Sequence, residues 1–201
     1  MHFLPTLPKF ISLDLAESEI QDGWIAQFRG FGYVSRVIAA ASGGVHSHSA
    51  LLGRTDRGVE AIEVRELIGG RTIRLRDYFL QTKAKCAIDI FSINTKRFPE
   101  FNGEGAVERS RDFVRRAKYN YKQIVRLLCR RTPIIWRLGA NTTDDDATIG
   151  NVEAHCSHAV ADWCRLGGGV DPVPRLPDHF VDPNHLTRSL LFEYHGTLRG
   201  D

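Results

Sequence analysis

Hydrophobic and polar residues follow one another in a pattern that predicts strands in the first half of the chain. Alternating side chains predict a hairpin in which 45–52 turns through 53–58 and returns over 59–67. Gly69 and Gly70 predict a second turn into a strand over 71–75, and β-branched and aromatic residues favour another strand over 86–93. The predicted strands are 23–29, 45–52, 59–67, 71–75, 86–93 and 190–198.

Apolar residues at helical spacing predict three helices, over 35–41, over 104–130 and from Cys156 to the glycines at 167–169. Proline-punctuated residues 1–22 predict an extended lead-in, 137–150 a polar loop and 170–183 an irregular segment with four prolines. Strands followed by helices and a terminal strand indicate an α+β fold. We expect one domain over 23–201, with an antiparallel sheet packed against the long helix and the helix at Cys156.

Composition adds few constraints. The chain has 201 residues, enough for one domain with a sizeable core, and its net charge of +3 is too small to indicate nucleic-acid binding. Four cysteines without a CxxC pair favour a reducing compartment. No signal peptide or membrane-spanning run is evident, so we expect a cytoplasmic protein, with a phage origin or signal-less export as alternatives. The sequence does not indicate the oligomeric state.

Cys156 is the strongest candidate for chemistry. A cysteine in the first turn of a helix lies at the positive end of the helix dipole, among backbone N–H groups that lack intrahelical partners. Both features favour the thiolate, which is the nucleophilic form, and the same N–H groups can stabilise an oxyanion. The alternative is that Cys156 is a small buried apolar residue, as free cysteines often are.

A nucleophilic cysteine needs a base, and His48 at the mouth of a predicted strand is placed to serve as one. His46 points in the same direction in a regular strand, so the pattern does not exclude it. A third polar group usually orients such a base, and the return strand of the hairpin offers three glutamates. Alternation puts Glu60 and Glu66 on one face and Glu63 on the other, so only one set can face the histidine.

Two other types of site remain as alternatives. His46, His48, His155, Cys156 and His158 are potential zinc ligands, but their spacing matches no recognised zinc motif, and we expect neither a metal nor a cofactor. The predicted long helix is rich in arginine and lysine and offers a phosphate-binding face. Acidic residues (Glu104, Glu108 and Asp112) are interleaved with them, which favours an ordinary solvated face.

Several short motifs occur in an order that resembles a known family. They are Phe28-Arg29-Gly30, Ser35-Arg36-Val37-Ile38, Ser47-His48-Ser49-Ala50, Glu63-Val64-Arg65-Glu66-Leu67-Ile68-Gly69-Gly70-Arg71, Ile88-Asp89-Ile90-Phe91, Tyr119-Asn120-Tyr121, Cys156-Ser157-His158 and Pro183-Asn184-His185-Leu186-Thr187-Arg188-Ser189. The ordered set resembles the circularly permuted branch of the NlpC-type papain-like cysteine peptidases. In that branch the histidine strand precedes the nucleophile helix, as it does here.

The resemblance implies a permuted papain-like core with a catalytic triad. It implies Cys156 as nucleophile, His48 as base and Glu63 as the residue that orients the base, with Glu60 as the alternative. It also implies that Tyr119 or Tyr121 lies near the oxyanion hole. The Ser157-His158 step departs from the family, whose cysteine is usually followed by serine and an acidic residue. A Cys-x-His step is similar to lecithin-retinol acyltransferase-like proteins, which transfer acyl groups on lipids.

These observations predict a cysteine-dependent hydrolase that forms a thioester acyl-enzyme. The expected substrate is a peptide or an amide, and by family analogy a cell-wall peptide. The alternatives are a lipid thioesterase or acyltransferase that uses an acyl substrate, and a binding module with an inert thiol.

Overall fold

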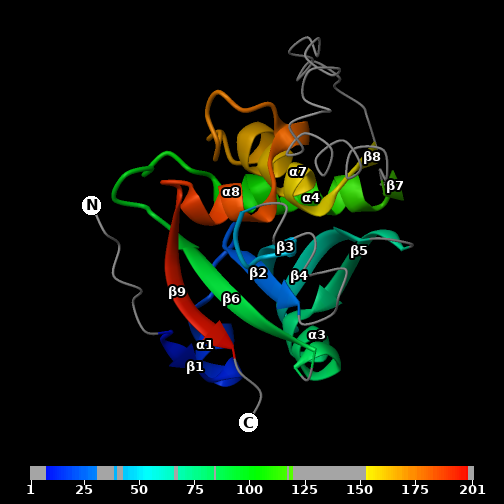
Figure 1. Cartoon of the computed structure of the whole chain (residues 1–201), viewed down its shortest axis with the longest axis vertical. Coiled ribbons are helices and arrows are strands. Elements are labelled where there is room, and N and C mark those ends of the chain that lie inside the picture. Colours follow the sequence, from blue (N-terminus) through cyan, green and yellow to red (C-terminus); the bar gives the residue numbers. More distant parts are fainter. Residues whose placement is uncertain are drawn as a thin grey trace.

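In the computed structural model, a curved sheet of seven strands forms the centre of the molecule (Figure 1). The structure describes residues 8–30, 39, 43–65, 68–83, 85–116, 118–119 and 153–198. The strand order is β1-β9-β6-β2-β3-β4-β5. The strands are β1 Phe10–Ile11, β2 Ile25–Gly30, β3 His48–Thr55, β4 Gly58–Arg65, β5 Gly69–Arg74, β6 Cys86–Ile93 and β9 Phe192–Leu198.

Helices cover the sheet on both sides, which gives an α+β architecture as the sequence predicts (Figure 1). A short separate pair of parallel strands, β7 (Lys118–Tyr119) and β8 (Glu153–Ala154), lies beside the helices. The helices are α1 Leu13–Glu19, α3 Leu75–Thr82, α4 Gly103–Val114, α7 Cys156–Asp162 and α8 Pro183–Arg188, with a π-helix at Trp163–Gly167 and a 3-10 helix at Asp178–Phe180.

The sheet is mixed, whereas the sequence predicted an antiparallel one. Six strands pair antiparallel with their neighbours in the sheet, in the order β9, β6, β2, β3, β4 and β5. The edge strand β1 pairs with β9 in parallel. Two residues of the N-terminal segment make this added pair, Phe10 opposite Thr197 and Ile11 opposite Leu198. The parallel pair therefore comes from the segment for which no strand was predicted.

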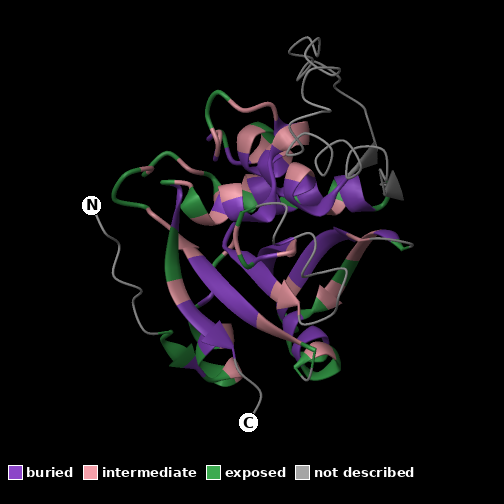
Figure 2. Ribbon diagram, viewed as in Figure 1, coloured by how far each residue is buried: buried purple, intermediate pink, exposed green. Residues whose placement is uncertain are grey.

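Alternation along the central strands sends apolar side chains into two cores, one on each face of the sheet (Figure 2). Ile25 and Leu51 face the layer that contains α4 and α7, whereas Ala26 and Leu52 face α1 and α3. Trp163, which is fully buried, is the largest side chain of the first core. The sheet is thus buried on both sides, and the segment entering β3 lies next to α7.

The extended lead-in predicted for 1–22 is wrong over 10–20, where β1 and α1 form. Ser12 caps α1 by accepting a hydrogen bond from the Leu15 N–H at 3.2 Å. Ala16 and Ile20 are fully buried in the second core. Tertiary packing of this apolar pair stabilises a helix that is too short to form alone.

The helix predicted over 104–130 is shorter than expected, because α4 ends at Val114. Phe113 and Val114 are its last buried apolar residues, and the N–H of Arg116 bonds the carbonyl of Phe113 in a closing turn. β7 follows at 118–119, so the helical prediction fails there as well. Residues 120–130 lie outside the described residues, as do the polar loop at 137–150 and, apart from Ala39, the helix predicted over 35–41.

Two short helices occur where none was predicted. Leu75, predicted to end a strand, is the first residue of α3, and Pro183, the last residue of the segment predicted to be irregular, is the first residue of α8. A proline is well placed there, because the first helical N–H needs no partner. No helix among the described residues is long and apolar enough to cross a membrane.

Candidate active site

Cys156 is the first residue of α7, at the position that the sequence predicts. His155 precedes it with an extended backbone, and the His155 carbonyl accepts the first helical bond, from Ala159 N–H at 2.9 Å. The Cys156 side chain is buried, and the backbone N–H groups of Ser49 and Ser157 act to lower the pKa of its thiol. Two fixed donors therefore stabilise negative charge on the sulfur.

His48 is the first residue of β3 and contacts both other members of the predicted triad. Its Nε2 hydrogen-bonds Glu63 Oε2, and its ring lies close enough to Cys156 for the two groups to shift each other's pKa. The ring also packs against Phe28, with 5.3 Å between the ring centroids. The structure therefore brings Cys156, His48 and Glu63 together from α7, β3 and β4, in the order of nucleophile, base and orienting group.

Glu63 is fully buried, and both of its carboxylate oxygens have donors. Oε1 accepts from Arg71 Nε at 2.5 Å, and Oε2 accepts from the Tyr78 hydroxyl at 2.8 Å in addition to facing His48. Burial alone would raise the pKa of this carboxyl, but His48, Arg71 and Tyr78 outweigh burial and lower it to about 2. Glu63 is therefore a carboxylate at neutral pH.

The charges of His48 and Cys156 stabilise one another. Burial opposes a charged imidazole, but the neighbouring Cys156 and Glu63 raise the pKa of His48 to about 10. Burial likewise opposes a thiolate, but His48 and the N–H groups of Ser49 and Ser157 lower the pKa of Cys156 below its ordinary value. The arrangement favours a thiolate–imidazolium pair, with the Glu63 carboxylate behind the imidazolium.

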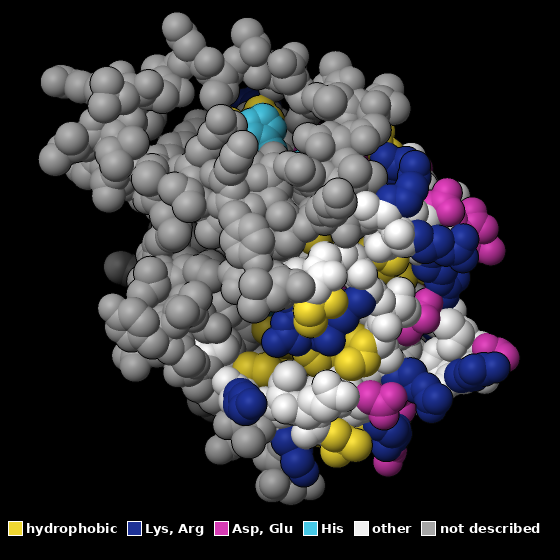
Figure 3. All heavy atoms as spheres, turned by 90° about the vertical axis from the view of Figure 1, so that its right-hand side faces the viewer, with side chains coloured by type: hydrophobic (Ala, Val, Ile, Leu, Met, Phe, Trp, Pro, Cys, Tyr) yellow, Lys and Arg dark blue, Asp and Glu magenta, His cyan; other side chains and the backbone are white. Residues whose placement is uncertain are grey.

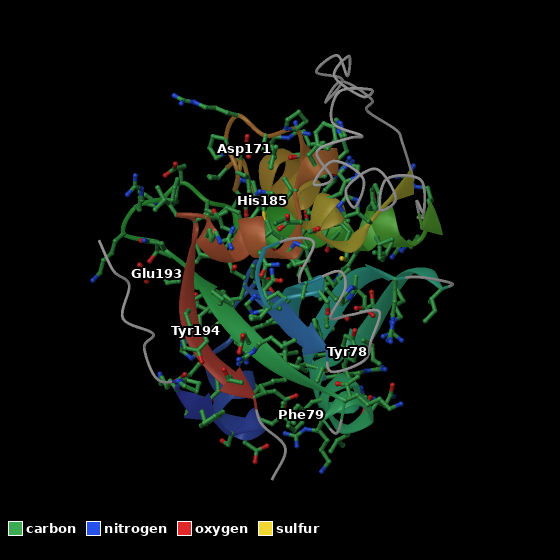
Figure 4. The ribbon with its side chains drawn as sticks, in the orientation of Figure 1. Tyr78, Phe79, Asp171, His185, Glu193 and Tyr194 are labelled. Carbon is green, nitrogen blue, oxygen red and sulfur yellow. The ribbon has the colours of Figure 1, made fainter. Side chains whose placement is uncertain are left out.

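Arg71 and Tyr78 complete the surroundings of Glu63, and neither residue was predicted to belong to the site. Tyr78 lies on α3, on the side of the sheet opposite α4 and α7 (Figure 4). The Arg71 guanidinium carbon is 5.0 Å from the centre of the Tyr78 ring. Arg71 is directly opposite Glu63 in the β4–β5 pair. A hairpin whose turn is centred on residue 67 pairs these two positions, so the sequence carries a signal that could have placed Arg71 beside Glu63. Tyr78 has no such signal.

The other candidates for the orienting residue lie elsewhere or outside the described residues. Glu60 accepts from Arg111 Nε at 2.7 Å and faces α4, on the opposite side of β4 from Glu63. The expected placement of Glu60 and Glu63 on opposite faces is therefore correct, and Glu60 is not beside His48. Glu66 and Tyr121 lie outside the described residues, and the side chain of Tyr119, in β7, is not described.

His46 faces away from the triad. Its Nε2 lies 2.7 Å from Asp89 Oδ2, and its Nδ1 lies 3.3 Å from Asn184 Oδ1. Residue 46 precedes β3, so the alternation that relates it to His48 in a regular strand does not apply. The alternative base is thus held in a separate buried network.

The remaining histidines of the zinc alternative lie on α7 and at its cap. The ring centroids of His155 and His158 are 5.6 Å apart. Burial lowers the pKa of His155 to about 4 and lowers that of His158 well below its ordinary value. His155 Nε2 donates to the Val181 carbonyl at 3.0 Å. Among the described residues, no three His, Cys, Asp or Glu side chains are grouped to hold a metal ion.

The basic residues of α4 form ion pairs with neighbouring elements. Arg109 lies 3.4 Å from Asp162, and Arg111 lies 2.6 Å from Glu60. On the face shown in Figure 3, the described basic and acidic side chains are interspersed. This distribution fits an ordinary solvated surface better than a phosphate-binding face.

A comparison of the sequence with models of known protein families finds no match, and a comparison with curated proteins finds none either. Among solved structures, the chain is similar to metalloprotein yiiX from Escherichia coli O157:H7, described as DUF1105. The similarity covers 90% of this chain and 98% of that one, with a TM-score of 0.54 and 11% sequence identity. At this identity the similarity is one of fold.

Proposed function

We propose that this protein is a cysteine-dependent hydrolase with a permuted papain-like core and a Cys156-His48-Glu63 triad. The observation that carries the proposal is a thiol in the first turn of a helix beside a histidine whose other partner is a buried carboxylate. A nucleophile, its base and the group that orients the base are the parts that acyl transfer requires. The ordered motifs, which resemble those of NlpC-type peptidases, favour the same reaction class.

In the first half of the reaction, the Cys156 thiolate attacks a substrate carbonyl carbon and forms a tetrahedral intermediate. The positive end of α7 stabilises the oxyanion. The carbon–nitrogen bond then breaks while the His48 imidazolium donates its proton to the leaving amine. The product is a thioester between the substrate acyl group and Cys156.

In the second half, His48 is neutral and removes a proton from water as the water attacks the thioester. The carbon–sulfur bond breaks, the carboxylic acid leaves, and the thiolate–imidazolium pair is restored. Glu63 stays ionised throughout, because it accepts hydrogen bonds from Arg71 and Tyr78 as well as from His48. Its part is to orient the imidazole and to stabilise its positive charge.

The substrate class that we propose is a peptide or amide, which the family resemblance favours. The test is turnover of peptidoglycan fragments and simple peptide amides, compared with acyl esters of lipids, with the acyl-enzyme followed by intact mass. Amide hydrolysis should be lost in Cys156→Ser and His48→Ala. It should persist in Cys164→Ser, the matched control, because burial raises the pKa of that thiol and keeps it protonated.

Two results would decide against this proposal. Turnover that survives Cys156→Ser excludes Cys156 as the nucleophile. Turnover of lipid esters alone, with an acyl group captured on Cys156, retains the triad but assigns the protein to the lipid acyl class.

A further inference from the structure

The segment that forms α8 has no part in the chemistry above, but it contacts both sides of the candidate site. Asn184, in the first turn of α8, is almost fully buried. Asn184 contacts the segment that leads into His48. Val181, which precedes the α8 cap, contacts the helix that begins at Cys156. The contacts on each side are specific.

On the His48 side, the Asn184 side chain binds the backbone of Val45 and His46 three times. Its Oδ1 accepts from the N–H groups of Val45 and His46, each at 3.1 Å, and its Nδ2 donates to the His46 carbonyl at 3.0 Å. Two N–H donors at one atom and a carbonyl at the other fix the orientation of the amide. Only Ser47 separates this clamp from His48.

Close packing reinforces the clamp. A Cβ at Gly44 would lie 2.1 Å from Asn184 Oδ1, so only glycine allows the backbone to approach this closely. Arg188, at the end of α8, donates to the Gly43 carbonyl at 2.5 Å. The Ser47 N–H donates to the Phe28 carbonyl at 2.9 Å, so the residue before His48 is also held by β2.

On the Cys156 side, the carbonyl of Val181 accepts two hydrogen bonds from residues that flank the thiol. His155 Nε2 donates at 3.0 Å and Ser157 Oγ at 2.7 Å. Val181 directly precedes Asp182, whose carboxylate caps α8 through the N–H groups of Asn184 and His185. The α8 turn is thereby fixed to both neighbours of Cys156.

We propose that Asn184 is a positioning residue which, through α8, sets the distance and angle between the His48 imidazole and the Cys156 sulfur. This role rests on the proposed function, since it concerns the same site. A hydrogen bond between these groups weakens steeply with distance and misalignment, so release of residues 43–47 should reduce the thiolate fraction without removing any member of the triad.

The experiment measures two properties of the intact protein in Asn184→Ala, Asn184→Asp and Gly44→Ala, with Thr187→Ala as control. Thr187 Oγ donates only to the Asn184 carbonyl within α8, so its loss leaves the clamp in place. The first property is amide hydrogen exchange of residues 43–47. The second is the rate of Cys156 alkylation by iodoacetamide as a function of pH, with the labelled residue mapped by mass spectrometry.

We expect Asn184→Ala and Gly44→Ala to accelerate exchange at 43–47 and to slow alkylation at about pH 6 by roughly tenfold, with little change at alkaline pH where any thiol ionises. Asn184→Asp keeps the acceptor and should be intermediate, while Thr187→Ala should match the wild type. Folded Asn184→Ala or Gly44→Ala protein with the wild-type alkylation profile overturns the inference. So does unfolding of both Asn184 variants, which would make Asn184 a residue required for folding.

Failure of the proposed function gives a different pattern. In that case the wild-type protein itself lacks alkylation of Cys156 at low pH, whatever the variants do. The exchange measurement still tests whether Asn184 holds residues 43–47.

Discussion

The hydroxyl of Tyr78 donates at 2.8 Å to Oε2 of Glu63, the same carboxylate oxygen that hydrogen-bonds His48. Tyr78→Phe should therefore destabilise the fold by about 1.5–3 kcal/mol, the range for a hydrogen bond to a charged group. It should also lower kcat/KM by roughly tenfold, because the carboxylate is less firmly held. Thermal unfolding and steady-state kinetics measure the two effects. Tyr194→Phe is the control: it removes a hydroxyl that hydrogen-bonds Thr197 Oγ1 at 2.6 Å and does not contact the triad. It should leave kcat/KM unchanged.

Arg71 donates a hydrogen bond to Oε1, the other carboxylate oxygen of Glu63. Its removal should have a larger effect on the pH profile of kcat/KM than on the free energy of unfolding. Arg71→Ala should raise the pKa of Glu63, because the carboxylate loses a cationic partner, while Glu63 stays ionised where His48 titrates. The imidazolium of His48 then loses a neighbouring positive charge, so the alkaline limb of kcat/KM should move to higher pH. Arg71→Lys should restore it only in part, because a lysine lacks the planar guanidinium that binds the carboxylate and lies against Tyr78.

Arg74→Ala is the matched control for Arg71→Ala. Arg74 lies on the same strand, is largely exposed, and its nearest acidic atom, on Asp77, is 4.0 Å away. Its replacement should change neither the pH profile nor the free energy of unfolding by more than about 0.5 kcal/mol. An equal shift of the alkaline limb in both variants would contradict the role assigned to Arg71.

The pKa of Glu63 makes the stability of the protein depend on pH in a defined direction. Its value in the fold, about 2, lies below the ordinary 4.5, so its ionised form stabilises the fold fully above pH 4.5 and loses this effect as pH falls through 2. Glu63→Gln should cost about 3–5 kcal/mol at neutral pH, because His48 and Arg71 lose a buried partner. Denaturant unfolding as a function of pH should show this difference shrinking below pH 4.5. A difference that stays constant to lower pH would be inconsistent with an ionised Glu63.

Much of the fold could be predicted because its signals are local. The strand over Cys86–Ile93 has the predicted bounds, and the helix at Cys156 begins where an apolar pattern follows a polar step. Alternation in the hairpin also separates Glu63 from Glu60, since a residue's face depends only on its position in the strand. Residue chemistry proposed His48 as the base for Cys156 but left His46 open, and the family resemblance favoured His48, because nothing local relates residues 48 and 156.

The elements that were missed depend on tertiary contacts. The eight-residue helix α3 has no side-chain cap, and Leu75, Tyr78 and Phe79 stabilise it by packing under the sheet. Its most important side chain, Tyr78, could not be assigned to the site before the helix was known. The role of α8 was hidden for the same reason, since Asn184 acts on backbone about 140 residues earlier in the chain.

The environments of the described cysteines predict selective modification. Burial raises the pKa of the Cys164 and Cys86 thiols, whereas His48 and two backbone N–H groups lower that of Cys156. A short treatment with iodoacetamide at about pH 6 should therefore label Cys156 well before Cys86 and Cys164. Peptide mapping measures the order. Labelling of Cys86 first, which is the least buried of the three, would show that access rather than ionisation controls reactivity.

The central claim is that His48 holds Cys156 as a thiolate, and titration of that thiolate by ultraviolet absorbance tests it most directly. The signal is the difference between the wild type and Cys156→Ser. The account predicts a midpoint below the ordinary value of 9.0 in the wild type, and a midpoint at or above 9.0 in His48→Ala, where burial acts unopposed by the imidazolium. A wild-type midpoint at or above 9.0 that does not move in His48→Ala would contradict the account.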